Sequence, residues 1–125
     1  MQLAGLARRA PRFAVSGIIA TSIHAVVAAG VMHLVRPSPP LANALGFAIA
    51  TVSSYLINTM WSFSSSPDRR NFGRFVTVSL LGCGMAAAVS GLAQQYGFHF
   101  WMGFAFVVLT APPMTFLLHS YWTYK

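Results

Sequence analysis

Acidic residues are almost absent from this sequence. Of its 125 residues only Asp68 is acidic, and only 7% of the residues are charged. An ordinary soluble domain has about 25% charged residues, so this composition cannot provide a water-facing surface. The shortage of carboxylates also excludes most general acid–base pairs and most metal sites built from oxygen ligands. The sequence therefore does not encode a soluble globular enzyme.

Cysteine is equally scarce, since Cys83 is the only one. A single cysteine excludes an internal disulfide and a cysteine-based zinc site. The four histidines form no recognisable ligand set, and no credible nucleophile–base pair is present. We therefore expect no metal, no other cofactor and no enzymatic activity.

Long uncharged stretches are what the sequence has in abundance: 56% of the residues are hydrophobic and the mean hydropathy is +0.63. A helix needs about 20 apolar residues to cross the roughly 30 Å hydrocarbon layer. The uncharged stretches predict an all-α, polytopic membrane protein with four transmembrane helices, over about 13–35, 41–62, 75–95 and 100–122. The basic residues lie at the edges of these stretches: Arg8, Arg9, Arg12, Arg36, Arg69, Arg70, Arg74 and Lys125.

The positions of these basic residues predict an orientation. Seven of the eight lie at the termini or between the second and third helices, and only Arg36 lies on the opposite side. Cytoplasmic loops carry an excess of Lys and Arg, so we expect the N and C termini and the middle loop to be cytoplasmic. Topology and contacts with anionic membrane lipids explain the net charge of +7, and we expect no binding to nucleic acid.

The two halves of the chain resemble each other. Arg12-Phe13 aligns with Arg74-Phe75 at an offset of 62, and residues 55–63 align with 116–124 at an offset of 61, Trp over Trp. Two arbitrary hydrophobic hairpins would share a general likeness, but the aligned Trp motifs favour a true duplication. Each half contains two predicted helices, so both halves begin on the same side of the membrane, unlike inverted transporter repeats.

The sequence thus predicts two tandem parallel helical-hairpin repeats with basic flanking segments. The segments are a cytoplasmic N-terminal tail (1–12), a first hairpin (13–63), a cytoplasmic loop (64–74) and a second hairpin (75–125).

The pair Arg12-Phe13 at the start of the first half, and Asn-Thr-Met-Trp-Ser-Phe over 58–63 at its end, resemble the GtrA-like membrane family. The likeness covers about 12–125. The family's recurring signature is Asn-x-x-Trp-x-Phe at the end of each hairpin, and the first copy matches it fully. The second copy has His119 in place of Asn and Tyr124 in place of Phe. His24 lies near a position where members often carry an acid.

The resemblance implies a function. Members are thought to flip polyprenyl-phosphate-linked sugars across the bacterial cytoplasmic (inner) membrane, where a membrane glycosyltransferase uses them in cell-surface polysaccharide synthesis or modification. One alternative is a non-transporting subunit that anchors or recruits a glycosyltransferase, because the Trp motifs would serve an anchor as well. A small multidrug-type exporter is less favoured, because it relies on a membrane-embedded carboxylate and Asp68 lies in a predicted loop.

Two sets of residues recur at i, i+4 and i+7, each set on one face of a predicted helix. A sugar headgroup that enters hydrocarbon loses its water, so we take these sets as candidate substrate-binding residues. Interfacial aromatic belts and interhelical hydrogen bonds are the alternative interpretation. The sets are Ser54, Asn58 and Trp61 in the second helix and Thr115, His119 and Trp122 in the fourth.

Three further residues complete the candidate site. His24 lies about midway along the first predicted helix, where it would bind phosphate or a sugar hydroxyl, titrate, or bond a neighbouring helix. Arg12 and Arg74 lie at the expected cytoplasmic headgroup level, where the phosphate of a polyprenyl phosphate lies, although orientation alone also explains them. Four helices are few to enclose a sugar headgroup, so we expect a lateral groove or, preferably, a homo-oligomer.

Overall fold

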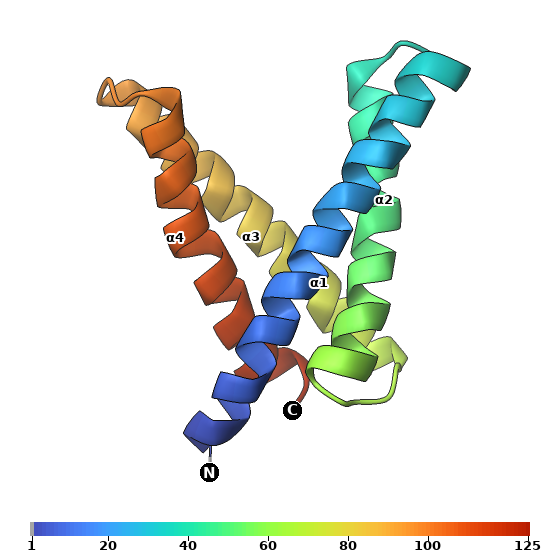
Figure 1. The fold of residues 1–125 in the computed structure, drawn as a ribbon, viewed down its shortest axis with the longest axis vertical. Helices are drawn as coiled ribbons and strands as arrows, with labels where there is room; N and C mark the ends of the chain where they lie inside the picture. The colour runs from blue at the N-terminus through green and yellow to red at the C-terminus, as the bar shows by residue number, and fades with distance from the viewer. Residues whose placement is uncertain (1) are drawn as a thin grey trace. The chain divides into compact units, whose positions relative to one another are not determined.

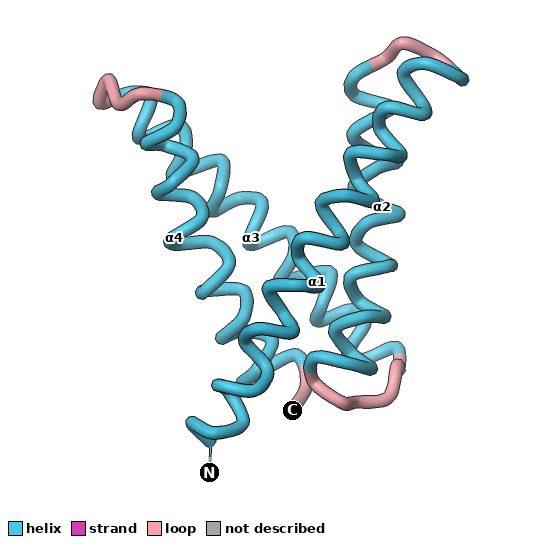
Figure 2. The backbone as a smooth tube through the Cα atoms, in the orientation of Figure 1, coloured by secondary structure: helices cyan, strands magenta, loops and turns pink. Residues whose placement is uncertain are grey.

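The computed structural model describes residues 2–125, which form helices and short connections (Figures 1 and 2). The four long helices are α1 (Gln2–Gly30), α2 (Pro39–Ile57), α3 (Arg69–Gln95) and α4 (Phe100–Leu118). Three of them continue into one wider, π-helical turn each: η1 (Val31–Val35) after α1, η2 (Asn58–Ser62) after α2 and η3 (His119–Thr123) after α4.

Four helices are long and apolar enough to cross a membrane. They cover Leu3–Val35, Leu41–Ser62, Arg69–Gln95 and Trp101–Thr123. Many of their large apolar side chains, such as Ile18, Val26 and Leu109, are exposed. Such surfaces match hydrocarbon rather than water. The predicted all-α class with four transmembrane helices is therefore confirmed.

The chain divides into two compact units, Met1–Pro67 and Asp68–Lys125. In the first unit, here called the first hairpin, α1 packs against α2 and residues 36–38 connect them. In the second unit, the second hairpin, α3 packs against α4 and residues 96–99 connect them. Within each unit the two helices run side by side in opposite directions (Figure 1).

Two helices begin earlier than the sequence predicted. Helix α1 already includes most of the predicted tail, and α3 begins at Arg69, inside the predicted loop 64–74. A capping box explains the start of α3: Asp68 Oδ1 accepts a hydrogen bond from Asn71 N at 2.8 Å, and Asp68 N donates to Asn71 Oδ1 at 3.1 Å. These bonds satisfy otherwise unpaired groups at the helix start. The single acidic side chain therefore starts a helix.

A glycine permits close helix approach in each hairpin. A Cβ atom at Gly46 of α2 would lie 2.7 Å from His24 Cδ2 of α1, and one at Gly82 of α3 would lie 2.8 Å from Thr115 Cγ2 of α4. Both distances are shorter than carbon atoms tolerate, so an added methyl group would displace the facing residue. Small residues of this kind let helices pack closely in lipid.

Candidate functional site

The buried polar side chains gather where α2 and α4 end. In η2, the side chains of Asn58, Thr59 and Ser62 are 1%, 0% and 1% exposed. We call these three residues the first polar turn. The aligned residues of η3, called the second polar turn, are equally enclosed: His119, Ser120 and Thr123 are 2%, 6% and 1% exposed.

The wider backbone turn explains this burial. Phe63 N donates to Asn58 O at 2.8 Å, and Tyr124 N donates to His119 O at 3.1 Å, so each hydrogen bond spans five residues instead of four. A π-turn of this kind is rare and is frequently found at functional sites. It changes which residues face the hairpin interior after positions 58 and 119. Two stretches that are far apart in the sequence thus form the same uncommon turn at aligned positions.

The two tryptophans do not share this buried side. The side chains of Trp61 and Trp122 are 42% and 40% exposed, whereas Ser62 and Thr123 beside them are buried. The sequence analysis did not select the buried hydroxyl residues as site candidates, although the alignment of the two halves also pairs them. They are Thr59 with Ser120 and Ser62 with Thr123, together with Ser16.

The first polar turn contains an acceptor without a donor. Asn58 Nδ2 donates to Ser54 O at 2.9 Å and to Ser54 Oγ at 3.1 Å. Asn58 Oδ1, in contrast, is buried and has no hydrogen-bond partner within the described residues 2–125. A buried polar atom left in this state costs about 1–3 kcal/mol. Asn58 Oδ1 is therefore the atom of this turn that gains most from an incoming hydroxyl donor.

A serine from α1 extends the first polar turn. Ser16 is fully buried, its Oγ lies 3.1 Å from Ser62 Oγ, and it donates to Arg12 O at 2.9 Å. This side-chain bond joins the beginning of the first hairpin to its end. The predicted residue Ser54 is half-buried and holds Asn58 in place.

The second polar turn is closed by an aromatic ring. The His119 ring stacks on Phe75 of α3, with centroids 4.5 Å apart and planes 14° apart. Its Nδ1 lies 2.9 Å from Thr123 Oγ1. The fully buried Val78 occupies the position that aligns with Ser16. Packing against α3 is therefore more apolar here than in the first hairpin.

Thr115 lies in α4, on the side that faces α3, and its hydroxyl bonds the backbone of its own helix. Its Oγ1 donates to Pro112 O at 3.0 Å, and a Cβ atom at Gly82 would meet its methyl group. The structure therefore gives Thr115 a contact in helix packing rather than a place in the second polar turn.

An arginine contacts a tryptophan in the same way in both hairpins. Arg12 Nη1 donates to Trp61 O at 3.0 Å, and its guanidinium carbon lies 5.6 Å from the centroid of the indole ring. Arg74 Nη1 donates to Trp122 O at 2.7 Å, with a guanidinium–ring distance of 5.2 Å. Each arginine thus satisfies a carbonyl near a helix end. The bond uses one of five N–H donors, so donors remain for an anion.

His24 lies apart from the first polar turn. Its Nε2 atom is 3.2 Å from Asn43 Oδ1 of α2, and its ring lies against Gly46. Asn43 and Gly46 belong to the first two turns of α2, whereas Asn58 follows its last residue. At 1.5 Å per residue this separation is roughly 20 Å along the helix. The sequence predicted that His24 lies about midway along its helix. In the structure it packs against the beginning of α2, near the connection 36–38.

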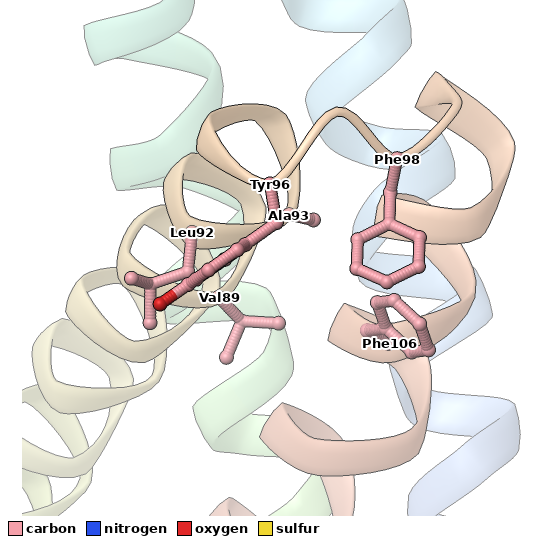
Figure 3. A pocket seen from close by; sticks show the side chains of 6 residues that line it. All are labelled: Val89, Leu92, Ala93, Tyr96, Phe98 and Phe106. Carbon is pink, nitrogen blue, oxygen red and sulfur yellow. The ribbon is translucent and has the colours of Figure 1, made fainter.

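The second hairpin also contains an open, apolar groove near residues 96–99 (Figure 3). Its volume is about 220 Å³. The rings of Phe98 and Phe106 meet edge to face, with centroids 5.3 Å apart, and Figure 3 shows them across from Leu92 and Tyr96. Because almost no polar atoms line it, this groove fits an apolar chain rather than a sugar. The sequence analysis did not identify it, although four aromatic residues in 96–101 were an available signal.

Comparison with known proteins identifies one family. The family model described as "GtrA/DPMS, transmembrane domain" matches residues 12–124, which include both hairpins, both arginine–tryptophan contacts and both polar turns. No curated protein and no solved structure matches the chain. Together with the four apolar helices, the match makes this chain a multi-pass membrane protein.

Proposed function

Because this chain belongs to the GtrA/DPMS transmembrane domain family, we propose that it flips a polyprenyl-phosphate-linked sugar across the bacterial cytoplasmic membrane. The family membership supports a membrane protein that works with sugars on carrier lipids. The flipped lipid would then serve a membrane glycosyltransferase in cell-surface polysaccharide synthesis or modification. The proposed reaction breaks and forms no covalent bond, so it requires neither a catalytic residue nor a cofactor.

The observation that carries this proposal is the buried, unpartnered Asn58 Oδ1 in the first polar turn. A sugar hydroxyl that donates to Asn58 Oδ1 replaces a hydrogen bond that it lost on leaving water. The same bond gives the buried oxygen a donor. Asn58 is enclosed in the resting chain, so the sugar enters when η2 opens. The other hydroxyls of the turn, Thr59 and Ser62, then bind further sugar oxygens.

The charged end of the carrier lipid binds beside the same turns. Arg12 and Arg74 are half-buried, and each lies over the indole of a half-exposed tryptophan. A phosphate accepts hydrogen bonds from the remaining guanidinium donors. Trp61 and Trp122 offer flat apolar faces on which a sugar ring stacks. Phosphate and sugar are thus bound at the end of a hairpin, while the polyprenyl chain stays in the lipid.

The distribution of charge supports a cytoplasmic position for both polar turns. Arg12 bonds the backbone of η2 and Arg74 bonds the backbone of η3. Arg70 bonds the carbonyl of Lys125, just after η3. The positive-inside rule places such residues in the cytoplasm. The substrate is therefore bound from the cytoplasmic leaflet. Since one hairpin offers little surface around a sugar, we also propose that a second copy of the chain completes the enclosure.

Transport by purified protein in liposomes tests the proposal. The liposomes contain a polyprenyl-phosphate-linked hexose, and a membrane-impermeant oxidant of sugar diols reports how much of it has crossed. We expect the wild-type protein to accelerate crossing, and Asn58→Ala to slow it about tenfold, the change that one lost hydrogen bond of about 1.4 kcal/mol produces. Ser53→Ala is the matched control, because Ser53 lies on the same helix and its hydroxyl bonds the backbone oxygen of Ile49, one turn earlier. If folded wild-type protein moves no such lipid, the transport function is refuted and the glycosyltransferase anchor is favoured.

A further inference from the structure

The first hairpin contains a second polar feature that the proposed function does not use. His24 of α1 and Asn43 of α2 meet at 3.2 Å between Nε2 and Oδ1. The imidazole is half-buried, and the Asn43 side chain is exposed on the hairpin surface. Both residues lie inside helices that can cross a membrane, Leu3–Val35 and Leu41–Ser62.

Close helix packing determines where the ring lies. A Cβ atom at Gly46 would lie 2.7 Å from His24 Cδ2, 3.0 Å from His24 O and 3.2 Å from His24 Nε2. The glycine therefore allows the imidazole to lie close against α2, with Nε2 within hydrogen-bond distance of Asn43 Oδ1. The pair is held by the packing of the two helices as well as by its hydrogen bond.

The second hairpin has no polar pair in the aligned positions. Ala86 aligns with His24 at the offset of 62, and Phe104 aligns with Asn43 at the offset of 61. Near its own connection that hairpin instead has the apolar groove between Phe98, Phe106 and Leu92. The repeat therefore does not explain His24 and Asn43, because only one copy of it contains them.

The pair combines a half-buried imidazole with an exposed amide inside helices that can cross a membrane, a position that usually marks a functional site. Polar groups in transmembrane helices are rare and face protein or a wet cavity, because hydrocarbon offers them no hydrogen bonds. In the first hairpin itself, Asn43 faces outward. A sugar suits this surface, because an imidazole and an amide each provide both a donor and an acceptor, which is what hydroxyl groups require.

We propose that His24 and Asn43 form an outer binding site for the sugar of the lipid-linked substrate, which receives the sugar after it leaves the first polar turn. This inference rests on the proposed function. The two sites lie on one hairpin, roughly 20 Å apart along α2, and the outer site is near the connection that faces away from the cytoplasm. The site binds hydroxyl groups and not the phosphate.

A comparison of two lipids tests this assignment. Binding to wild-type protein in nanodiscs is measured for a polyprenyl-phosphate-linked hexose and for the bare polyprenyl phosphate. We expect His24→Leu and Asn43→Leu to weaken binding of the sugar-linked lipid about tenfold and to leave the affinity for the bare lipid unchanged. Ser22→Ala is the matched control, because Ser22 lies on α1 like His24 and its exposed hydroxyl bonds the backbone oxygen of Ile18.

The outcomes separate this inference from the proposed function. If Asn58→Ala impairs transport while His24→Leu and Asn43→Leu bind the sugar-linked lipid like wild type, the outer site is refuted and the flippase proposal stands. Equal loss of both lipids in the two leucine variants also refutes the site, because it indicates that the pair only supports helix packing. If wild-type protein binds neither lipid, the proposed function itself fails.

Chemical labelling gives a second test that does not depend on affinity. In a Cys83→Ala background, Ala44→Cys, at the exposed residue next to Asn43, is treated with a membrane-impermeant thiol reagent. We expect the cysteine to react and the sugar-linked lipid to slow the reaction at least threefold, while bare polyprenyl phosphate does not. A cysteine that never reacts would show that lipid, the other hairpin or a second copy covers the position, and would overturn the outer site.

Discussion

The two hairpins are alike at one end and different at the other. At the ends of α2 and α4, each has an arginine over a tryptophan and three buried polar residues on a π-turn. Near the helix connections, the first hairpin has the polar pair His24 and Asn43, whereas the second has an apolar groove. Identical contacts at aligned positions are what a duplicated binding end would preserve, and the differences indicate where the copies have separate tasks.

The two similar ends nevertheless differ at the aligned residues Asn58 and His119. Asn58 Oδ1 lacks a donor, whereas the aligned His119 stacks on Phe75 and bonds Thr123. The first polar turn is therefore an incomplete hydrogen-bond network that a ligand can complete. The second is more closely packed, because the His119 ring lies against the ring of Phe75. This difference can be tested with variants, because a binding residue and a packing residue respond differently to removal.

Removal of the aligned side chains of His119 and Asn58 should give the largest difference in stability. His119→Ala deletes a buried stacked ring and leaves a cavity, so we expect it to lower the free energy of unfolding by about 2–3 kcal/mol. Asn58→Leu removes the unpartnered acceptor together with two hydrogen bonds, so stability changes by less than about 1 kcal/mol. Thermal and denaturant unfolding in detergent micelles, followed by circular dichroism, measures both. Equal losses in the two variants would contradict the distinction between the turns.

Replacement of the glycines at the helix contacts, Gly46 and Gly82, should give a smaller difference in stability. At Gly46 an added methyl group meets the backbone oxygen of His24 at 3.0 Å as well as its ring, whereas at Gly82 it meets only the methyl group of Thr115. Backbone cannot move aside as a side chain can. We therefore expect Gly46→Ala to destabilise the protein by about 1–3 kcal/mol and Gly82→Ala by less. The same unfolding measurements test this order, with Gly17→Ala as the control at an uncrowded position.

Much of the fold was predictable because the thickness of the hydrocarbon layer sets the helix lengths. The basic residues mark the edges of the uncharged runs, and the observed spans Leu41–Ser62 and Trp101–Thr123 lie within a residue of the predicted ones. The early start of α3 was missed because Asn71 replaces the Glu or Gln of an ordinary capping box. Asp68 therefore seemed to be a loop residue.

The candidate site was predicted less well, because helical periodicity assumes 3.6 residues per turn. With that period Trp61 shares a face with Asn58 and Ser54, but the π-turn at 58–62 instead buries Thr59 and Ser62. A backbone turn of this kind depends on packing between helices and leaves no mark in the periodicity. Asn43 was missed for a related reason: only the tertiary contact with His24 distinguishes it from other polar residues in apolar runs.

The smallest expected effect is the coupling between arginine and tryptophan. A cation over an exposed aromatic ring contributes about 0.5–1 kcal/mol, so a double-mutant cycle with Arg12→Ala and Trp61→Leu should give a coupling energy in this range. The bond from the guanidinium to the Trp61 carbonyl survives the change of side chain, so the cycle isolates the ring contact. The cycle with Arg74→Ala and Trp122→Leu should give the same value within error, because the distances 5.6 and 5.2 Å are nearly equal. A coupling in one hairpin only would show that the likeness of the two ends is geometric and not energetic.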